Sequence, residues 1–167
     1  ALNASGSVDV GTISAALDDS DAQTRRLGTL ALLDADDLPE RQLLIEKALT
    51  DRSAMVRFDA LVAYGEHGRL RGCNSLVDAV EDQSSHVSLR ALDLLGEGCP
   101  TGPSPTSFVA SIAGGLNRDG DWHRPVHALV ALSKLNQNRA AGLLPRFVEH
   151  PVWQVRMYGA RAATQLG

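Results

Sequence analysis

A helical segment rich in small residues returns five times along this chain of 167 residues. The copies are RRLGTLALL (25–33), RFDALVAYG (57–65), SLRALDLLG (88–96), PVHALVALS (125–133) and RMYGARAAT (156–164). Their starts are 32, 31, 37 and 31 residues apart. Units of this length bury their apolar faces against neighbouring units rather than around one central core. The pattern therefore predicts a stack of helical units, and it indicates a scaffold more clearly than a chemistry.

Composition agrees with an all-α chain that has a buried interior. Hydrophobic residues make up 44% of the sequence, which is enough for one domain or one short array. Aromatic residues make up only 4%, while alanine and leucine are frequent, and this favours closely packed helices over a sheet of β-branched residues. We expect a single array without long disordered regions.

Each unit is predicted to be a helix, a tight turn and a second helix. Apolar residues four apart mark the first helix, as Ile13 and Leu17 do in the first unit. A column of small residues in the second helix permits close helix crossing; it consists of Gly28, Ala60, Ala91, Ala128 and Gly159. Polar residues predicted to cap the second helices are Asp21, Ser53, Ser84 and Asp121. The expected units are 8–35, 39–68, 70–98, 104–136 and 139–167, with a loop at GCPTGPSPTS (98–107).

These residues resemble a known repeat family. The segment TDRSAMVRFDALVAYG (50–65), with its polar turn followed by Val-Arg and a small residue, is similar to the compact bacterial form of the HEAT repeat. The resemblance covers nearly the whole chain and implies a right-handed α-solenoid, or superhelix, of about five HEAT-like helical hairpins. HEAT arrays of the armadillo-like class serve mostly as scaffolds and occasionally as enzymes. The arginine after the turn is present as Arg25, Arg57 and Arg156 but is replaced by Ser88 and Pro125.

A narrower resemblance involves the last two units. WHRPVHALVAL (122–132) and HPVWQVRMYGARAA (150–163) look like segments of bacterial proteins in which HEAT repeats precede a cyclophilin-type peptidyl-prolyl isomerase domain. This resemblance implies that the chain is the client-presenting repeat arm of an isomerase. It assigns no catalytic residue to the chain.

Charge and motifs exclude several functions. The net charge is -4 and the basic residues are scattered, so we expect no nucleic-acid partner. No apolar run is long enough to cross a bilayer, so we expect a soluble chain without membrane insertion. Catalytic triads, nucleotide loops and Cys-x-x-Cys motifs are absent from the sequence, so we expect no cofactor and no enzymatic activity in this segment. A catalytic domain elsewhere in the polypeptide is compatible with this expectation.

One rival hypothesis is a metal-dependent enzyme on a HEAT scaffold. His123 and His127 are four residues apart and share a helix face, which suits two zinc ligands. Zinc needs at least a third protein ligand, and the sequence shows only an unassigned residue of the fourth-unit loop for that role. A capping or surface histidine pair is the simpler interpretation.

Cys73 and Cys99 lie at opposite ends of the third unit, near the start of its first helix and just beyond its second. These ends meet in an antiparallel hairpin, so a disulfide is feasible if the Cα atoms lie within about 7 Å. Two separate buried thiols are the alternative. A disulfide would favour an exported or periplasmic location, and free thiols would fit the cytosol.

The face made by successive second helices is the expected binding surface, because it lines the concave side of such stacks. It mixes charged and apolar groups, and the candidate contacts with a protein or peptide are Asp59, Arg90, Asp93, His127, Tyr158 and Arg161. Trp122 and Trp153 precede the last two second helices and could form an aromatic ledge or fill the gap between units. An ordinary solvated helix face is the alternative to a binding surface.

The sequence therefore predicts a non-enzymatic protein-interaction scaffold. Ala162, Ala163 and Leu166 remain apolar at the end of the last unit, where a further repeat or a polar cap would be expected. We accordingly expect further repeats or a second domain in the same polypeptide.

Overall fold

The computed structural model describes residues 9–34, 40–68, 72–118 and 120–167, and all regular structure in those ranges is helical. This confirms the predicted all-α class. Helices follow one another as antiparallel pairs, each pair being one hairpin. In chain order the ten α-helices of the described residues are α1 (Val10–Leu17), α2 (Ala22–Ala31), α3 (Arg41–Leu49), α4 (Ala54–Ala63), α5 (Asn74–Val80), α6 (Ser85–Leu95), α7 (Thr106–Gly114), α8 (His123–Leu135), α9 (Gln137–Val148) and α10 (Trp153–Ala163).

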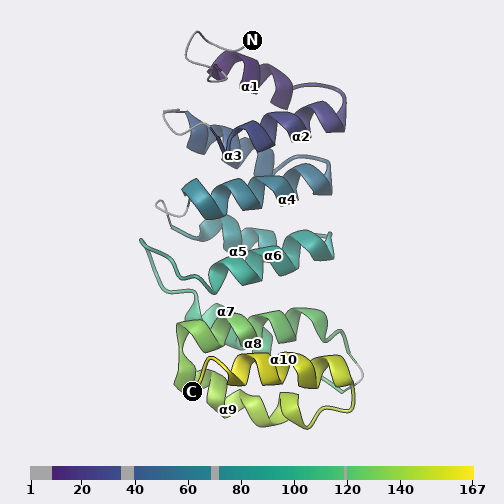
Figure 1. Cartoon of the computed structure of the whole chain (residues 1–167), viewed down its shortest axis with the longest axis vertical. Helices are drawn as coiled ribbons and strands as arrows, with labels where there is room; N and C mark the ends of the chain where they lie inside the picture. Colours follow the sequence, from purple (N-terminus) through teal and green to yellow (C-terminus); the bar gives the residue numbers. More distant parts are fainter. Residues whose placement is uncertain (1–8, 35–39, 69–71, 119) are drawn as a thin grey trace.

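The hairpins follow one another along the long axis of the molecule, from α1 and α2 at one end to α9 and α10 at the other (Figure 1). The second helices form a continuous row, because α2 packs on α4, α4 on α6, α6 on α8 and α8 on α10. First helices pack on one another less extensively. The row of second helices is therefore the longest continuous surface built from equivalent positions.

Buried aliphatic side chains hold each hairpin together. In the first helices of the first three hairpins, Ile13, Ile45 and Leu76 are at most 1% exposed. The last two hairpins use a different phase: Ile112 and Leu144 are half-buried, while Val109 and Phe147 are fully buried instead. The burial of Ile13 in the first unit is therefore repeated at the equivalent positions of the next two hairpins, and the buried positions shift along the first helix in the last two.

The small-residue column explains how closely the two helices of a hairpin approach. A Cβ atom added at Gly28 of α2 would lie 2.8 Å from the Cβ of Ala16 in α1. At Gly159 of α10 it would lie 3.1 Å from a methyl group of Val148 in α9. Both glycines therefore serve helix crossing rather than an unusual backbone conformation.

Two local features depart from the regular repeat. The chain continues α4 as a short π-helical turn, Tyr64–Gly68, and the buried Tyr64 hydroxyl donates to the carbonyl of Gly72 over 2.7 Å. The segment 96–105 lengthens the connection from α6 to α7 at the predicted loop. Gly96 ends α6 directly against α8, since a Cβ there would lie 2.9 Å from the Cα of Ala131. Among the described helices, none is long and apolar enough to cross a membrane.

Candidate functional site

Arginines at the start of second helices join consecutive hairpins. Arg25 of α2 pairs with Asp51, which lies in the turn before α4, with Nε–Oδ2 at 2.7 Å and Nη2–Oδ1 at 3.1 Å. Arg57 of α4 pairs in the same way with Asp82, in the turn before α6, at 2.7 and 2.8 Å. In both arginines, Nη1 also donates to a backbone carbonyl in the turn that precedes the arginine's own helix. Each guanidinium therefore fastens its own hairpin and the next one.

The turn aspartates also shape the backbone. Asp51 accepts the amide hydrogen of Ser53, and Asp82 that of Ser84, each over 2.7 Å. The hydrogen bond from Arg57 holds the pKa of the Asp82 carboxyl below its ordinary value, and the same bond raises the pKa of Arg57. Ser53 and Ser84 precede their helices without making the predicted side-chain capping bond, whereas Asp21 makes it. Charge pairing between hairpins thus depends on acids that the capping prediction overlooked.

The pairing changes where the arginine is missing. Ser88 replaces it in α6, and its hydroxyl donates to the carbonyl of Val80 in its own hairpin. In the fifth hairpin a histidine, His150, takes the place of the turn aspartate. Its Nδ1 accepts the amide hydrogen of Val152, and its Nε2 lies 3.4 Å from the carbonyl oxygen of Asn117. The His150 imidazole therefore shapes this turn in place of a carboxylate.

Asp59 does not belong to an accessible binding surface. Its side chain is 7% exposed and forms an ion pair with Arg26 of the preceding second helix. A buried carboxylate that is already paired offers nothing to a partner without losing that pair. Asp59 is therefore removed from the candidate site, and it acts instead as a contact between α2 and α4.

Three of the other candidates come together across three helices. Asp93 of α6 lies 2.8 Å from Nδ1 of His127 in α8, and Nε2 of His127 lies 3.1 Å from the hydroxyl of Tyr158 in α10. The rings of His127 and Tyr158 are 5.1 Å apart between centroids. Both ring nitrogens of the histidine are engaged, so this cluster holds α6, α8 and α10 in register. Its role is therefore structural, since its hydrogen bonds connect neighbouring helices.

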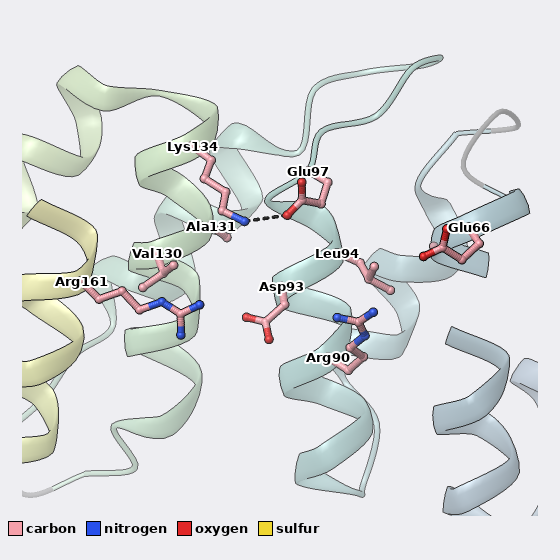
Figure 2. Close-up of a pocket in the computed structure, with 10 residues that line it drawn as sticks. Glu66, Arg90, Asp93, Leu94, Glu97, Val130, Ala131, Lys134 and Arg161 are labelled. Carbon is pink, nitrogen blue, oxygen red and sulfur yellow. Dashed lines mark hydrogen bonds and ion pairs between the residues drawn. The ribbon is translucent and has the colours of Figure 1, made fainter. Parts of the chain in front are cut away.

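A groove of about 420 Å³ lies beside this cluster, on the face of the second helices (Figure 2). Its charged lining comes from the π-helical turn after α4, from α6 and the residues just after it, from α8 and from α10. Lys134 of α8 and Glu97, just after α6, pair across it at 2.6 Å. The charged groups that line the groove are Glu66, Arg90, Asp93, Glu97, Lys134 and Arg161.

The arginines of the groove are available to a ligand. Figure 2 shows the guanidinium groups of Arg90 and Arg161 on either side of the Asp93 carboxylate. Asp93 already accepts from His127, and within the described residues neither guanidinium group has a hydrogen-bond or ion-pair partner. Arg161 is exposed and Arg90 is half-buried. The groove thus presents two guanidiniums from separate helices, α6 and α10, beside a carboxylate that is already engaged.

The tryptophans occupy different positions from one another. Trp122 lies just before α8, is half-buried and stacks on the ring of His123, with 3.9 Å between ring centroids. Trp153 is the first residue of α10 and is 61% exposed. No ring contact joins the two tryptophans in the described part of the chain. The aromatic ledge remains a prediction, and neither side chain lines the groove.

Cys73 and Cys99 form a disulfide, with their Cα atoms 5.7 Å apart. Cys73 precedes α5 and Cys99 follows α6, so the bond closes the third hairpin at its open end. It lies in the lengthened connection that precedes the hairpins carrying His127, Tyr158 and Arg161. The bond therefore fastens the hairpin that supplies Arg90 and Asp93.

The histidines considered as metal ligands have other partners. His123 bonds through Nδ1 to the exposed Asp121, while His127 bonds to Asp93 and Tyr158. The amide and imidazole of His123 also lower the pKa of Asp121. In the ranges that the structure covers, no three His, Cys, Asp or Glu side chains are grouped as metal ligands.

Comparisons with known proteins add no assignment to this geometry. The chain matches no protein-family model and no curated protein. The case for its function therefore depends on the groove, the charges around it and the packing of the hairpins.

Proposed function

We propose that this chain is a HEAT-like array, a right-handed α-solenoid, that binds a segment of a partner protein along its second helices. Three features support the architecture: the five-fold sequence pattern, the hairpins that follow one another in a row, and the successive packing of α2, α4, α6, α8 and α10. In such an array the second helices line the concave side, where extended ligands bind. The chain would then act without catalysing a reaction.

The pair Arg90 and Arg161 carries this proposal. A guanidinium binds a carboxylate through two parallel N–H···O bonds, which makes it selective for carboxylate and phosphate groups. The neighbouring carboxylates are engaged elsewhere, Asp93 by His127 and Glu97 by Lys134. A ligand that brings its own acidic groups would satisfy both arginines. We therefore propose that the partner segment carries at least two acidic side chains.

A protein segment suits the groove better than a nucleic acid. The groove is lined by residues of four hairpins, so a ligand that reaches both Arg90 and Arg161 has to extend across successive second helices, as a peptide segment does. Glu66, Asp93 and Glu97 line it beside its cations, and the net charge of the chain is -4. A phosphate backbone would face repulsion from these carboxylates. A peptide can place an acidic residue at each arginine and neutral or basic residues elsewhere.

Selection from a random peptide display library tests the proposal. The immobilised chain is expected to enrich peptides with two acidic residues separated by a short spacer. The variant Arg90→Ala/Arg161→Ala should lose this enrichment, because it removes both carboxylate-binding groups. Circular dichroism would verify that the variant remains folded.

A matched control removes two other arginines. Arg118 is exposed, and Arg139 makes one bond to the Ser107 hydroxyl at 3.2 Å. Both lie outside the groove, so Arg118→Ala/Arg139→Ala changes the net charge equally and should keep the acidic preference. Equal enrichment by the two double variants would contradict the proposal. The isomerase-arm and metal-enzyme hypotheses are not advanced further, since no contact among the described residues favours them.

A further inference from the structure

We infer that the two ends of the array recognise each other, so that copies of this chain associate head to tail. The last hairpin carries an arginine and an apolar side chain in the positions that contact a following hairpin. The first hairpin carries their matching partners. The inference concerns the end faces and is independent of the groove proposed above.

The internal junctions define what a hairpin offers to its successor. Arg25 and Arg57 each direct Nε and Nη2 to an aspartate in the next turn, Asp51 or Asp82. One residue further along α2, Arg26 contacts Asp59 of α4. The first junction therefore contains two pairs: a guanidinium with a turn aspartate, and the next side chain with a residue on the following second helix. The second junction repeats the first of these pairs.

Arg156 in α10 has the donor half of this arrangement. Its Nη1 donates to the carbonyls of His150 and Pro151, each over 2.8 Å. Arg25 makes the equivalent bonds to the carbonyls of Asp19 and Ser20, each over 2.9 Å. The guanidinium is thus held as in an internal junction. Within the described residues no carboxylate pairs with Arg156, which is exposed.

Asp19, in the first hairpin, has the acceptor half. Its Oδ1 accepts the amide hydrogen of Asp21 over 2.7 Å, the bond that Asp51 accepts from Ser53 and Asp82 from Ser84 at the same distance. The carboxylate is therefore in the conformation that receives an arginine elsewhere in the chain. Across the described ranges Asp19 has no ion-pair partner, and it is exposed.

Met157 and Leu27 occupy the positions that correspond to the second contact of the first junction, Arg26 with Asp59. Met157 follows Arg156 as Arg26 follows Arg25, which places Met157 where a side chain contacts the next hairpin. Leu27 lies two residues after Arg25, as Asp59 lies two after Arg57, which places Leu27 where a side chain contacts the preceding hairpin. Met157 is 51% exposed and Leu27 is 68% exposed, both high values for large apolar side chains.

A second copy therefore supplies both missing partners at once. Its Asp19 would pair with Arg156, and its Leu27 would cover Met157, as Arg25 with Asp51 and Arg26 with Asp59 do at the junction between the first two hairpins. The two surfaces differ, so the contact is heterologous and leaves one free end of each kind. Association should consequently continue beyond the dimer as concentration rises.

Sedimentation velocity over a range of about 1 to 100 µM tests this inference. The weight-average mass of the unmodified chain should increase with concentration past that of a dimer. Arg156→Asp and Asp19→Arg should each weaken association about tenfold or more, because each places like charges at the junction. An equal mixture of the two variants should associate again, since it restores the native pair of Arg156 and Asp19 between different copies. Arg139→Asp makes the same charge change at a side chain that contacts Ser107 of the preceding hairpin, and it should behave as the unmodified chain.

Several results would overturn the inference. A monomer at every concentration would contradict the inference and leave the end faces to another occupant, such as the further repeats expected in the same polypeptide. Association that persists unchanged in Arg156→Asp would place the contact elsewhere. A mixture of the two charge variants that stays monomeric would exclude the pairing of Arg156 with Asp19. Both residues are exposed, so circular dichroism should show folded variants in each experiment. Peptide selection at the groove would be unaffected by any of these outcomes.

Discussion

Arg57 and Asp82 join two consecutive hairpins through two parallel hydrogen bonds of 2.7 and 2.8 Å. Their side chains are 17% and 12% exposed, so the pair lies largely out of water. Replacing Asp82 with alanine would leave the guanidinium buried without its carboxylate. We expect Asp82→Ala to lower the free energy of unfolding by about 2 to 4 kcal/mol, measured by urea denaturation. Asp78→Ala, at an exposed position nearby, should change it by less than about 0.5 kcal/mol.

The same pair makes stability depend on pH. Arg57 lowers the pKa of Asp82 below its ordinary value of 3.8, so the ionised carboxylate stabilises the folded state. This contribution is complete above that ordinary value and is lost as the pH falls through the lowered pKa. We expect Asp82→Asn to unfold with a shallower dependence on pH in the acid range than the unmodified chain. If the free energy of unfolding fell equally steeply with decreasing pH in the two proteins, Asp82 would make no pH-dependent contribution to stability.

Gly28 should resist a substitution that normally favours helices. Alanine has the higher helix propensity, but its Cβ would meet that of Ala16 at 2.8 Å and push α1 from α2. We expect Gly28→Ala to destabilise the protein by about 1 to 3 kcal/mol in thermal or urea unfolding. Gly142→Ala in α9 is the matched control, because a Cβ there has no neighbour within 4 Å. It should raise stability by about 0.5 to 1 kcal/mol, and a loss similar to that of Gly28→Ala would refute the packing argument.

The disulfide should contribute to stability through the loop it closes. Cys73 and Cys99 are separated by 26 residues. Removing a bond across a loop of this size costs about 3 kcal/mol in the chain-entropy description. We expect Cys73→Ser/Cys99→Ser to lose that amount in urea unfolding. A reducing agent should lower the stability of the unmodified chain by a similar amount and leave that of the variant unchanged. If the reductant destabilised both proteins equally, its effect would not come from the Cys73–Cys99 bond.

His127 and Tyr158 should be energetically coupled. The hydroxyl of Tyr158 lies 3.1 Å from Nε2 of His127, which is itself held by Asp93. A double-mutant cycle with Tyr158→Phe and His127→Ala should give a coupling energy of about 0.5 to 1.5 kcal/mol in unfolding experiments. The two losses would simply add if the hydrogen bond contributed nothing.

Sequence periodicity was sufficient to predict the helical class and the pairing of helices, because apolar spacing and small residues act within one hairpin. Gly28 and Gly159 were recognised in this way. The contacts between hairpins were harder to predict, since they depend on how far one hairpin is rotated against the next. Asp59 was assigned to an exposed face for this reason, although it is buried against Arg26.

The interhairpin ion pairs had a sequence signal that the prediction did not use. An aspartate lies six residues before the arginine in the second unit, where Asp51 precedes Arg57, and the first unit repeats this spacing with Asp19 and Arg25. The pairing of Arg25 with Asp51 could have been inferred from that recurrence. The cluster of Asp93, His127 and Tyr158 had no such signal, because it occurs once and depends on the placement of α8 after the lengthened loop.

The affinity of an acidic peptide for the groove tests the central claim most directly. Fluorescence anisotropy would measure the Kd of a labelled peptide from the display selection for the unmodified chain, for Arg90→Ala/Arg161→Ala and for Arg118→Ala/Arg139→Ala. We predict that the groove variant weakens binding by about a hundredfold, since each charge-assisted contact contributes about 1.5 to 3 kcal/mol, and that the control binds normally. Equal Kd values for the groove variant and the unmodified chain would contradict the assignment of this groove as the binding site.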